Sequence, residues 1–172
     1  MRRRELVWGV VREPPSPYVP HQRVVTRIAA LLDTHVRTRN LGTVLVSPMD
    51  VILDGARALV VQPDVMFISR ARHDIIREFI WGPPDLVVEV ASRGTTEYDR
   101  TTKLHWYEQY GVRECWLVEL LPRGVTVVTF HGGRTERTMR GNDRVVSTVL
   151  PEFDEPADAF FAGPSEGSGD TT

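Results

Sequence analysis

Apolar and polar residues recur with two different periods along the chain, and these periods predict two helices among many short strands. Between Pro20 and Asn40, apolar residues are spaced by three, four and one, which is typical of a helix of about five turns with one buried side. A second helix is expected to begin at Thr95 or Thr96 and to end at Gly111, because glycine commonly follows the last helical residue.

Alternating or β-branched segments predict the strands. The opening apolar runs around Trp8 and Gly9 indicate a small hairpin or a bent strand, and an Asp54-Gly55 turn separates two later strands. The segment from Ser69 to Pro84 shows neither period and is interpreted as a loop. Strands are predicted over 42–47, 50–53, 58–61, 64–68, 85–91 and 114–120, a hairpin over 125–130 and 134–139, and a last strand over 145–150 before a short closing helix.

The strand over 85–91 carries two carboxylates in a mostly apolar setting. Because side chains alternate along a strand, Asp85, Val87 and Glu89 share one face and the intervening apolar residues share the other. Burial of an ionised carboxylate without a partner reduces the stability of a fold by several kcal/mol, so Glu89 requires a cation, a proton or a metal nearby.

Lys103, on the second predicted helix, is the only lysine among 21 basic residues. Arginine would serve wherever positive charge alone is needed, so a single lysine suggests that a compact ammonium is required there. The alternative is a solvated ion pair with Asp99, one turn earlier. Asp64 is equally open on its own, because an aspartate after Pro63 often just begins a turn.

The ordered set of Pro63-Asp64, PDLVVEV, a Ser-Thr turn, YDRTTKLHWY and GVRECWLVE resembles the bacterial putative restriction endonuclease family of the PD-(D/E)xK nuclease superfamily, formerly described as a domain of unknown function. The resemblance runs from about Glu5 to the LPEFDEPADAF segment. It implies an α/β (α+β) fold with a restriction-endonuclease-like core, in which a mixed central β-sheet is flanked by helices and extended by antiparallel hairpins.

The same resemblance implies a metal-dependent endonuclease. Asp64 and Glu89 would be catalytic metal ligands together with the backbone carbonyl near Val90, and Mg²⁺ would be the cofactor, with Mn²⁺ able to substitute. The lysine that the superfamily pattern places two residues after the glutamate falls at Ala91 in this sequence. Lys103 would take its role from the following helix, which departs from the general pattern.

Five further residues are secondary candidates. Asp85 shares the Glu89 face but follows a proline and could equally cap the strand. Glu5 lies in an ELVWG segment similar to one in the family, as an auxiliary acid or a rim ion pair. Gln62 could position the attacking water. His21 could contact a ligand or phosphate, or cap its helix. Tyr107 lies one turn after Lys103 and is expected to pack toward the sheet.

The net charge of −2 and a pI near 6.2 provide no overall attraction to nucleic acid, so binding would need a local arginine cluster, a metal or a partner. The expected nucleic acid is DNA. Its phosphates could be bound by Arg70, Arg72 and Arg77, which could equally form a solvated face. A catalytically degenerate binding or structural module is the alternative function.

Residues 1–162 are expected to form one domain, and the small polar residues 163–172 a disordered tail. The single cysteine, Cys115, allows no intrachain disulfide, which favours a reducing, cytoplasmic setting. No apolar run is long enough to cross a bilayer. A homodimer is expected because nucleases of this type often pair their sites to cut two strands.

Overall fold

The computed structural model describes residues 4–13, 16–91 and 99–162. The predicted tail over 163–172 and the predicted helix start at Thr95 or Thr96 lie outside the described residues. Among the described residues, no helix has the length and apolar character that a membrane span requires.

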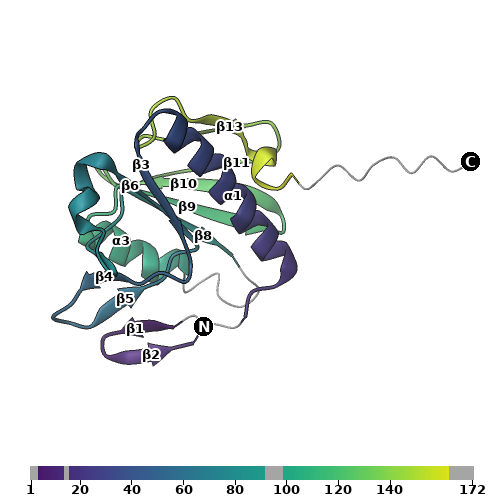
Figure 1. Cartoon of the computed structure of the whole chain (residues 1–172). Coiled ribbons are helices and arrows are strands. Elements are labelled where there is room, and N and C mark those ends of the chain that lie inside the picture. Colours follow the sequence, from purple (N-terminus) through teal and green to yellow (C-terminus); the bar gives the residue numbers. More distant parts are fainter. Residues whose placement is uncertain (1–3, 14–15, 92–98, 163–172) are drawn as a thin grey trace, which may run out of the picture.

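A six-stranded mixed sheet forms the centre of the fold (Figure 1). Its β8 and β9 strands are parallel, and every other neighbouring pair is antiparallel. The central β8 strand is the predicted PDLVVEV strand, and the predicted hairpin near its edge is present. In spatial order the strands are β11 (Thr135–Met139), β10 (Arg123–Thr129), β9 (Glu114–Leu120), β8 (Leu86–Val90), β6 (Val65–Ser69) and β3 (Gly42–Val46).

A second, five-stranded sheet includes the N-terminal hairpin. Trp8 and Gly9 connect β1 and β2 with φ values of 51° and 81°, the left-handed region that tight hairpin turns use. The hairpin prediction is therefore confirmed. In spatial order the strands are β2 (Val10–Arg12), β1 (Glu5–Val7), β5 (Leu59–Val61), β4 (Val51–Asp54) and β7 (Ile80–Trp81).

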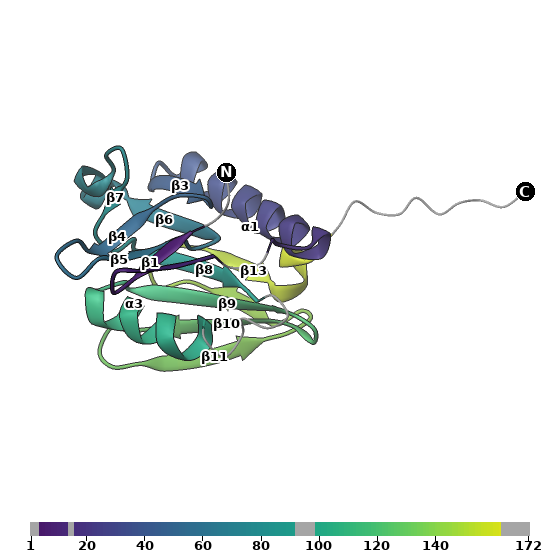
Figure 2. The same cartoon turned by 90° about the horizontal axis from the view of Figure 1, so that it is seen from below.

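Two hydrophobic layers cover the six-stranded sheet. The α1 helix (Val19–Thr38) packs on one face, where Ile28 and Leu32 meet Val88 and Trp116. The other face packs against α3 (Leu104–Tyr110) and the second sheet (Figures 1 and 2). Each fully buried aliphatic side chain contributes about 1.5–3 kcal/mol. The alternation expected for β8 holds, because Val88 belongs to the α1 layer and Val87 to the α3 layer.

The segment before α3 positions the lysine. A π-helical turn, η2 (Asp99–Lys103), leads directly into α3. The helix ends at Gly111, whose φ is 91° and whose N–H donates to the carbonyls of Tyr107 at 3.1 Å and Glu108 at 3.3 Å. The predicted end of this helix is confirmed, and Lys103 and Tyr107 are held one turn apart.

The predictions differ from the structure in two regions. Part of the supposed loop after Ser69 forms the 3₁₀ helix η1 (Arg70–Ile75) and the short β7 strand. The predicted last strand is wrong beyond β12 (Arg144–Val146). There the Ser147 hydroxyl accepts hydrogen bonds from the N–H groups of Val149 and Leu150, which closes a turn. The chain then forms β13 (Asp154–Pro156) and the short closing helix η3 (Ala157–Phe160).

Candidate active site

Asp64 and Glu89 meet where β6 begins and β8 ends. The antiparallel register pairs Val65 with Val88, and the Asp64 N–H donates to the Val88 carbonyl at 3.1 Å. The Asp64 Oδ2 accepts the Val90 N–H at 2.8 Å, so this carboxylate lies against the peptide that joins Glu89 to Val90. Both acids are 3% exposed. The structure therefore brings together the two residues predicted as metal ligands.

Lys103 lies between two carboxylates. Its Nζ is 2.7 Å from Glu5 Oε1 and 3.2 Å from Glu89 Oε1. Lys103 is 2% exposed and Glu5 is 4% exposed, so the ammonium is withdrawn from water. A solvated Lys103 is excluded for this reason, and the side chain of Asp99 lies outside the described part of the chain. Removal of either partner from a buried ion pair of this kind leaves an uncompensated charge and is strongly destabilising.

Tyr107 adds a hydrogen bond to Glu89 beside the contact of Lys103. Its hydroxyl donates to Glu89 Oε1 at 2.5 Å, from the same helix as Lys103. Burial, and then the nearby Glu89 carboxylate, raise the pKa of Tyr107 well above its usual value. The phenol consequently remains a hydrogen-bond donor, which fixes one oxygen of Glu89.

Gln62 connects the N-terminal hairpin to the site. Its backbone N–H donates to Glu5 Oε1 at 3.3 Å, and its side-chain Oε1 accepts the Arg4 N–H at 3.2 Å. Its Nε2 donates to Asp50 Oδ1 at 2.7 Å. Gln62 thus orients Glu5, and the role of Gln62 in positioning the attacking water stays a prediction. The sequence analysis did not identify Asp50, which belongs to no motif.

His21 approaches the same cluster from α1. Its Nε2 lies 3.3 Å from Asp64 Oδ2, and the residue is 4% exposed. Nδ1 has no hydrogen-bond partner among the described residues. The secondary candidates Glu5, His21 and Tyr107 therefore all contact one of the predicted acids or Lys103.

The charges of this cluster suit a hard divalent cation. Within the described ranges, Glu5, Asp64 and Glu89 are buried beside one ammonium, Lys103, and the titratable ring of His21. The described residues contain no three His, Cys, Asp or Glu side chains that converge as a ready-made metal cage. Mg²⁺ is usually held by one or two carboxylates and keeps several waters, so the donor set of Asp64 and Glu89 fits it.

Asp85 does not join the cluster. It is four residues before Glu89 along β8, a separation of roughly 13 Å in an extended strand. Its Oδ2 accepts the Ser69 N–H at 2.8 Å, and its Oδ1 lies 3.5 Å from Arg113 and 3.7 Å from Arg72. Asp85 thus lies at the other end of the strand, where it joins β6 to β8.

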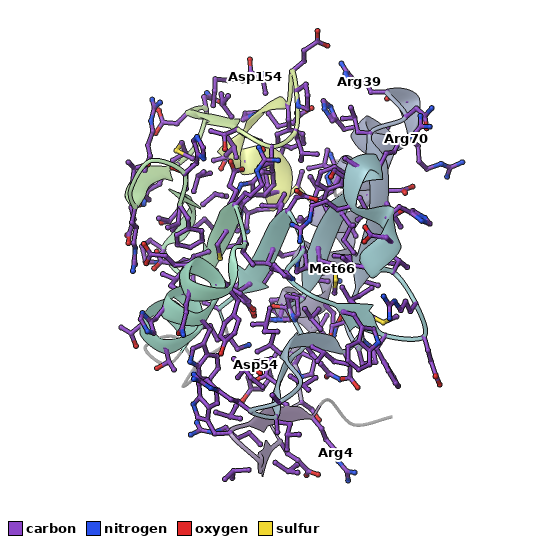
Figure 3. The ribbon with its side chains drawn as sticks, turned by 90° about the vertical axis from the view of Figure 1, so that its left-hand side faces the viewer. Arg4, Arg39, Asp54, Met66, Arg70 and Asp154 are labelled. Atoms are coloured by element: carbon purple, nitrogen blue, oxygen red, sulfur yellow. The ribbon has the colours of Figure 1, made fainter. Side chains whose placement is uncertain are left out.

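Two of the three arginines chosen for nucleic-acid contact also lie at that other end. Arg70 and Arg72 belong to η1, which follows the last residue of β6, whereas Asp64 precedes its first. Figure 3 shows Arg70 and Arg4 toward opposite ends of the molecule, with Met66 of β6 between them. Arg77 lies just beyond η1 and is exposed. Arg70 and Arg72 are not brought to the acidic cluster, and the contact of all three arginines with nucleic acid stays a prediction.

The fold has a counterpart among solved structures. The crystal structure of a putative nuclease belonging to DUF820 from Anabaena variabilis ATCC 29413 superimposes with a TM-score of 0.77 at 16% sequence identity. The match covers 92% of this chain and 89% of that chain. The predicted restriction-endonuclease-like α+β fold is thus confirmed, and the class is that of nuclease-fold proteins.

Sequence comparison identifies the family. The family model described as "Uma2: Putative restriction endonuclease" matches residues 1–158, and the chain belongs to this family. The curated proteins contain no match to the chain. The resemblance inferred from the motifs is therefore confirmed at the level of the family.

Proposed function

We propose that this chain is a metal-dependent endonuclease that hydrolyses phosphodiester bonds in DNA. The observation that carries the proposal is the buried convergence of Asp64, Glu89, Glu5 and Lys103 at one end of the central sheet. Membership of a family of nucleases supports the same activity. Buried acids in excess of their ammonium partner are costly in a structural site, which favours a chemical role.

Asp64 and Glu89 would hold Mg²⁺ or Mn²⁺, together with the Val90 carbonyl. A divalent ion at such a site lowers the pKa of a bound water and neutralises charge on the scissile phosphate. Tyr107 and the Val90 N–H hold one oxygen of each acid, so that the carboxylates are oriented before an ion arrives. Lys103 places positive charge beside Glu89 and would stabilise the developing negative charge of the transition state.

Substrate and assembly follow from the same reading. Nucleases of this type often pair their sites to cut two strands, so we propose a homodimer as the active form. A reducing, cytoplasmic compartment suits the single buried thiol of Cys115.

Cleavage of supercoiled plasmid in the presence of Mg²⁺, Mn²⁺ or EDTA tests the proposal. Wild-type protein should nick or linearise the plasmid with either metal, and EDTA should abolish the reaction. Glu89→Gln should lose the activity, whereas Glu108→Gln, the same change at an exposed position on α3, should keep it. Both variants should show the wild-type melting cooperativity.

Two results would contradict the proposal. Cleavage that persists in Glu89→Gln would remove the assigned site. Divalent binding without cleavage of duplex or single-stranded DNA would instead support the alternative, a catalytically degenerate binding module on the same fold.

A further inference from the structure

The first turn of α1 presents hydrogen-bond donors toward the acidic cluster. The helix begins at Val19 without a side-chain cap, and its first turn contains no acidic residue. The Gln22 N–H bonds to the Tyr18 carbonyl at 3.1 Å, but the N–H groups of Val19 and His21 have no hydrogen bond in the described part of the chain. Because a helix N-terminus carries partial positive charge, this turn is suited to an anion.

His21 provides a second and independent indication. The residue is 96% buried, and Nδ1 is, over the described ranges, the one buried side-chain nitrogen or oxygen without a partner. A buried polar atom left unsatisfied is costly, so such an atom indicates a ligand. Nδ1 is bonded to the ring carbon nearest the backbone and so lies beside the first turn, while Nε2 contacts Asp64 at 3.3 Å.

An anionic substrate also needs positive potential at this place. Glu5, Asp64 and Glu89 repel a phosphate, and Lys103 is 2% exposed and engaged by two of them. Arg70 lies toward the far end of the molecule (Figure 3). The α1 N-terminus is a positive feature that touches the cluster, through the contact between His21 and Asp64.

We propose that the first turn of α1 and His21 Nδ1 together bind one phosphate group of a nucleic-acid strand, beside Asp64. The inference rests on the proposed function for the identity of the strand, but the phosphate contact does not require cleavage. The backbone N–H groups and the ring nitrogen donate to the phosphate oxygens. An imidazole nitrogen that carries its proton donates a hydrogen bond, and Nδ1 is the ring nitrogen that Asp64 does not occupy. His21 is thereby a substrate-contacting residue.

Nuclear magnetic resonance of the ¹⁵N-labelled full chain without divalent metal tests this contact. Inorganic phosphate is one probe, and a short duplex with hydroxyl ends, which offers internal phosphodiesters alone, is the other. Both should shift the amide signals of Val19, His21 and Gln22 in a saturable manner. His21→Gln should weaken the affinity for both probes about tenfold or more, as expected for a lost hydrogen bond to a charged group.

His131→Gln is the matched control, because His131 is exposed in the turn between β10 and β11. It should bind both probes like the wild type. Unchanged dispersion of the remaining signals in His21→Gln will show that the variant is folded. If that variant is unfolded, the amide shifts of the wild-type protein decide the matter by themselves.

Shifts absent at these amides, or equal affinities of wild type and His21→Gln, would overturn the inference. Binding of inorganic phosphate without the duplex would overturn the assignment to nucleic acid. A chain that cleaves plasmid but shows no contact at α1 retains the proposed function and loses this inference. A chain that binds phosphate at α1 but cleaves nothing does the reverse.

Discussion

Replacement of Lys103 by methionine probes the buried charge cluster most sharply. Lys103→Met keeps an unbranched side chain of similar length in the same space and removes the ammonium between Glu5 and Glu89. The two carboxylates, whose Oε1 atoms now lie 2.7 Å and 3.2 Å from Nζ, would then face each other across an apolar group. Both are at least 96% buried, so water cannot replace the lost cation without local opening.

The expected loss is large for a single substitution. Breaking a buried ion pair by removal of one partner costs about 3–5 kcal/mol, because the other charge is left uncompensated. For a chain of this length each kcal/mol lowers the melting temperature by about 2–4 °C, so the melting temperature should fall by about 6–20 °C. A second substitution, Glu5→Gln, should restore part of this loss, because it removes one of the two carboxylates.

Urea unfolding followed by tryptophan fluorescence provides the free energy, with metal chelated throughout. Arg37→Met is the control, since Arg37 pairs with Asp33 at 3.5 Å on the exposed side of α1, where an ion pair contributes about 1 kcal/mol or less. A loss in Lys103→Met no larger than in Arg37→Met would refute the reasoning. So would a double variant that is less stable than Lys103→Met alone.

Three further substitutions test other polar contacts of the fold. Tyr107→Phe should lose about 1.5–3 kcal/mol at neutral pH, because it removes a buried hydrogen bond to a carboxylate. Since the pKa of Tyr107 is raised in the folded protein, the stability of the wild type should fall as pH rises above about 10. Tyr107→Phe should lack this contribution to the alkaline loss of stability. Identical alkaline stability profiles of the two proteins would contradict the assignment. The pKa of Asp54 is lowered by hydrogen bonds from the Arg57 backbone and Tyr110. The wild type should therefore be more stable than Asp54→Asn by a constant amount above about pH 4, and this difference should shrink as pH falls below that value. Acid unfolding followed by circular dichroism measures the difference. Glu114→Gln should destabilise the fold by about 1–3 kcal/mol in urea unfolding, because it puts an amide donor among the Trp116 and Thr148 donors; no measurable loss would exclude this role.

Most of the fold could be predicted because local patterns agree with the tertiary structure. Alternation in β8 assigned Val88 and Val87 to opposite faces, and the helix end at Gly111 follows from its left-handed backbone. The last strand failed beyond Val146 because a single hydroxyl, that of Ser147, redirects the chain, and β-branched composition does not reveal this. Local hydrogen bonding decided the outcome there.

The site could be predicted only in part. Asp64, Glu89 and Lys103 followed from the motif and from the single lysine, but their contact with Glu5 depends on how the N-terminal hairpin packs. Alternation could not separate Asp85 from Glu89, because it specifies the face of a strand and not the end. Glu114 had no signal at all: its partner Thr148 is 34 residues away, beyond any local pattern.

Binding of Mn²⁺ measured by isothermal titration calorimetry, on the wild-type chain and Asp64→Asn, tests the central claim most directly, because it reports the ion and not the chemistry. We expect saturable binding by the wild type and an affinity at least about tenfold lower in Asp64→Asn, as removal of a charged oxygen ligand implies. Asp85→Asn should bind like the wild type, since Asp85 lies at the far end of β8. Equal affinities in wild type and Asp64→Asn would contradict the account.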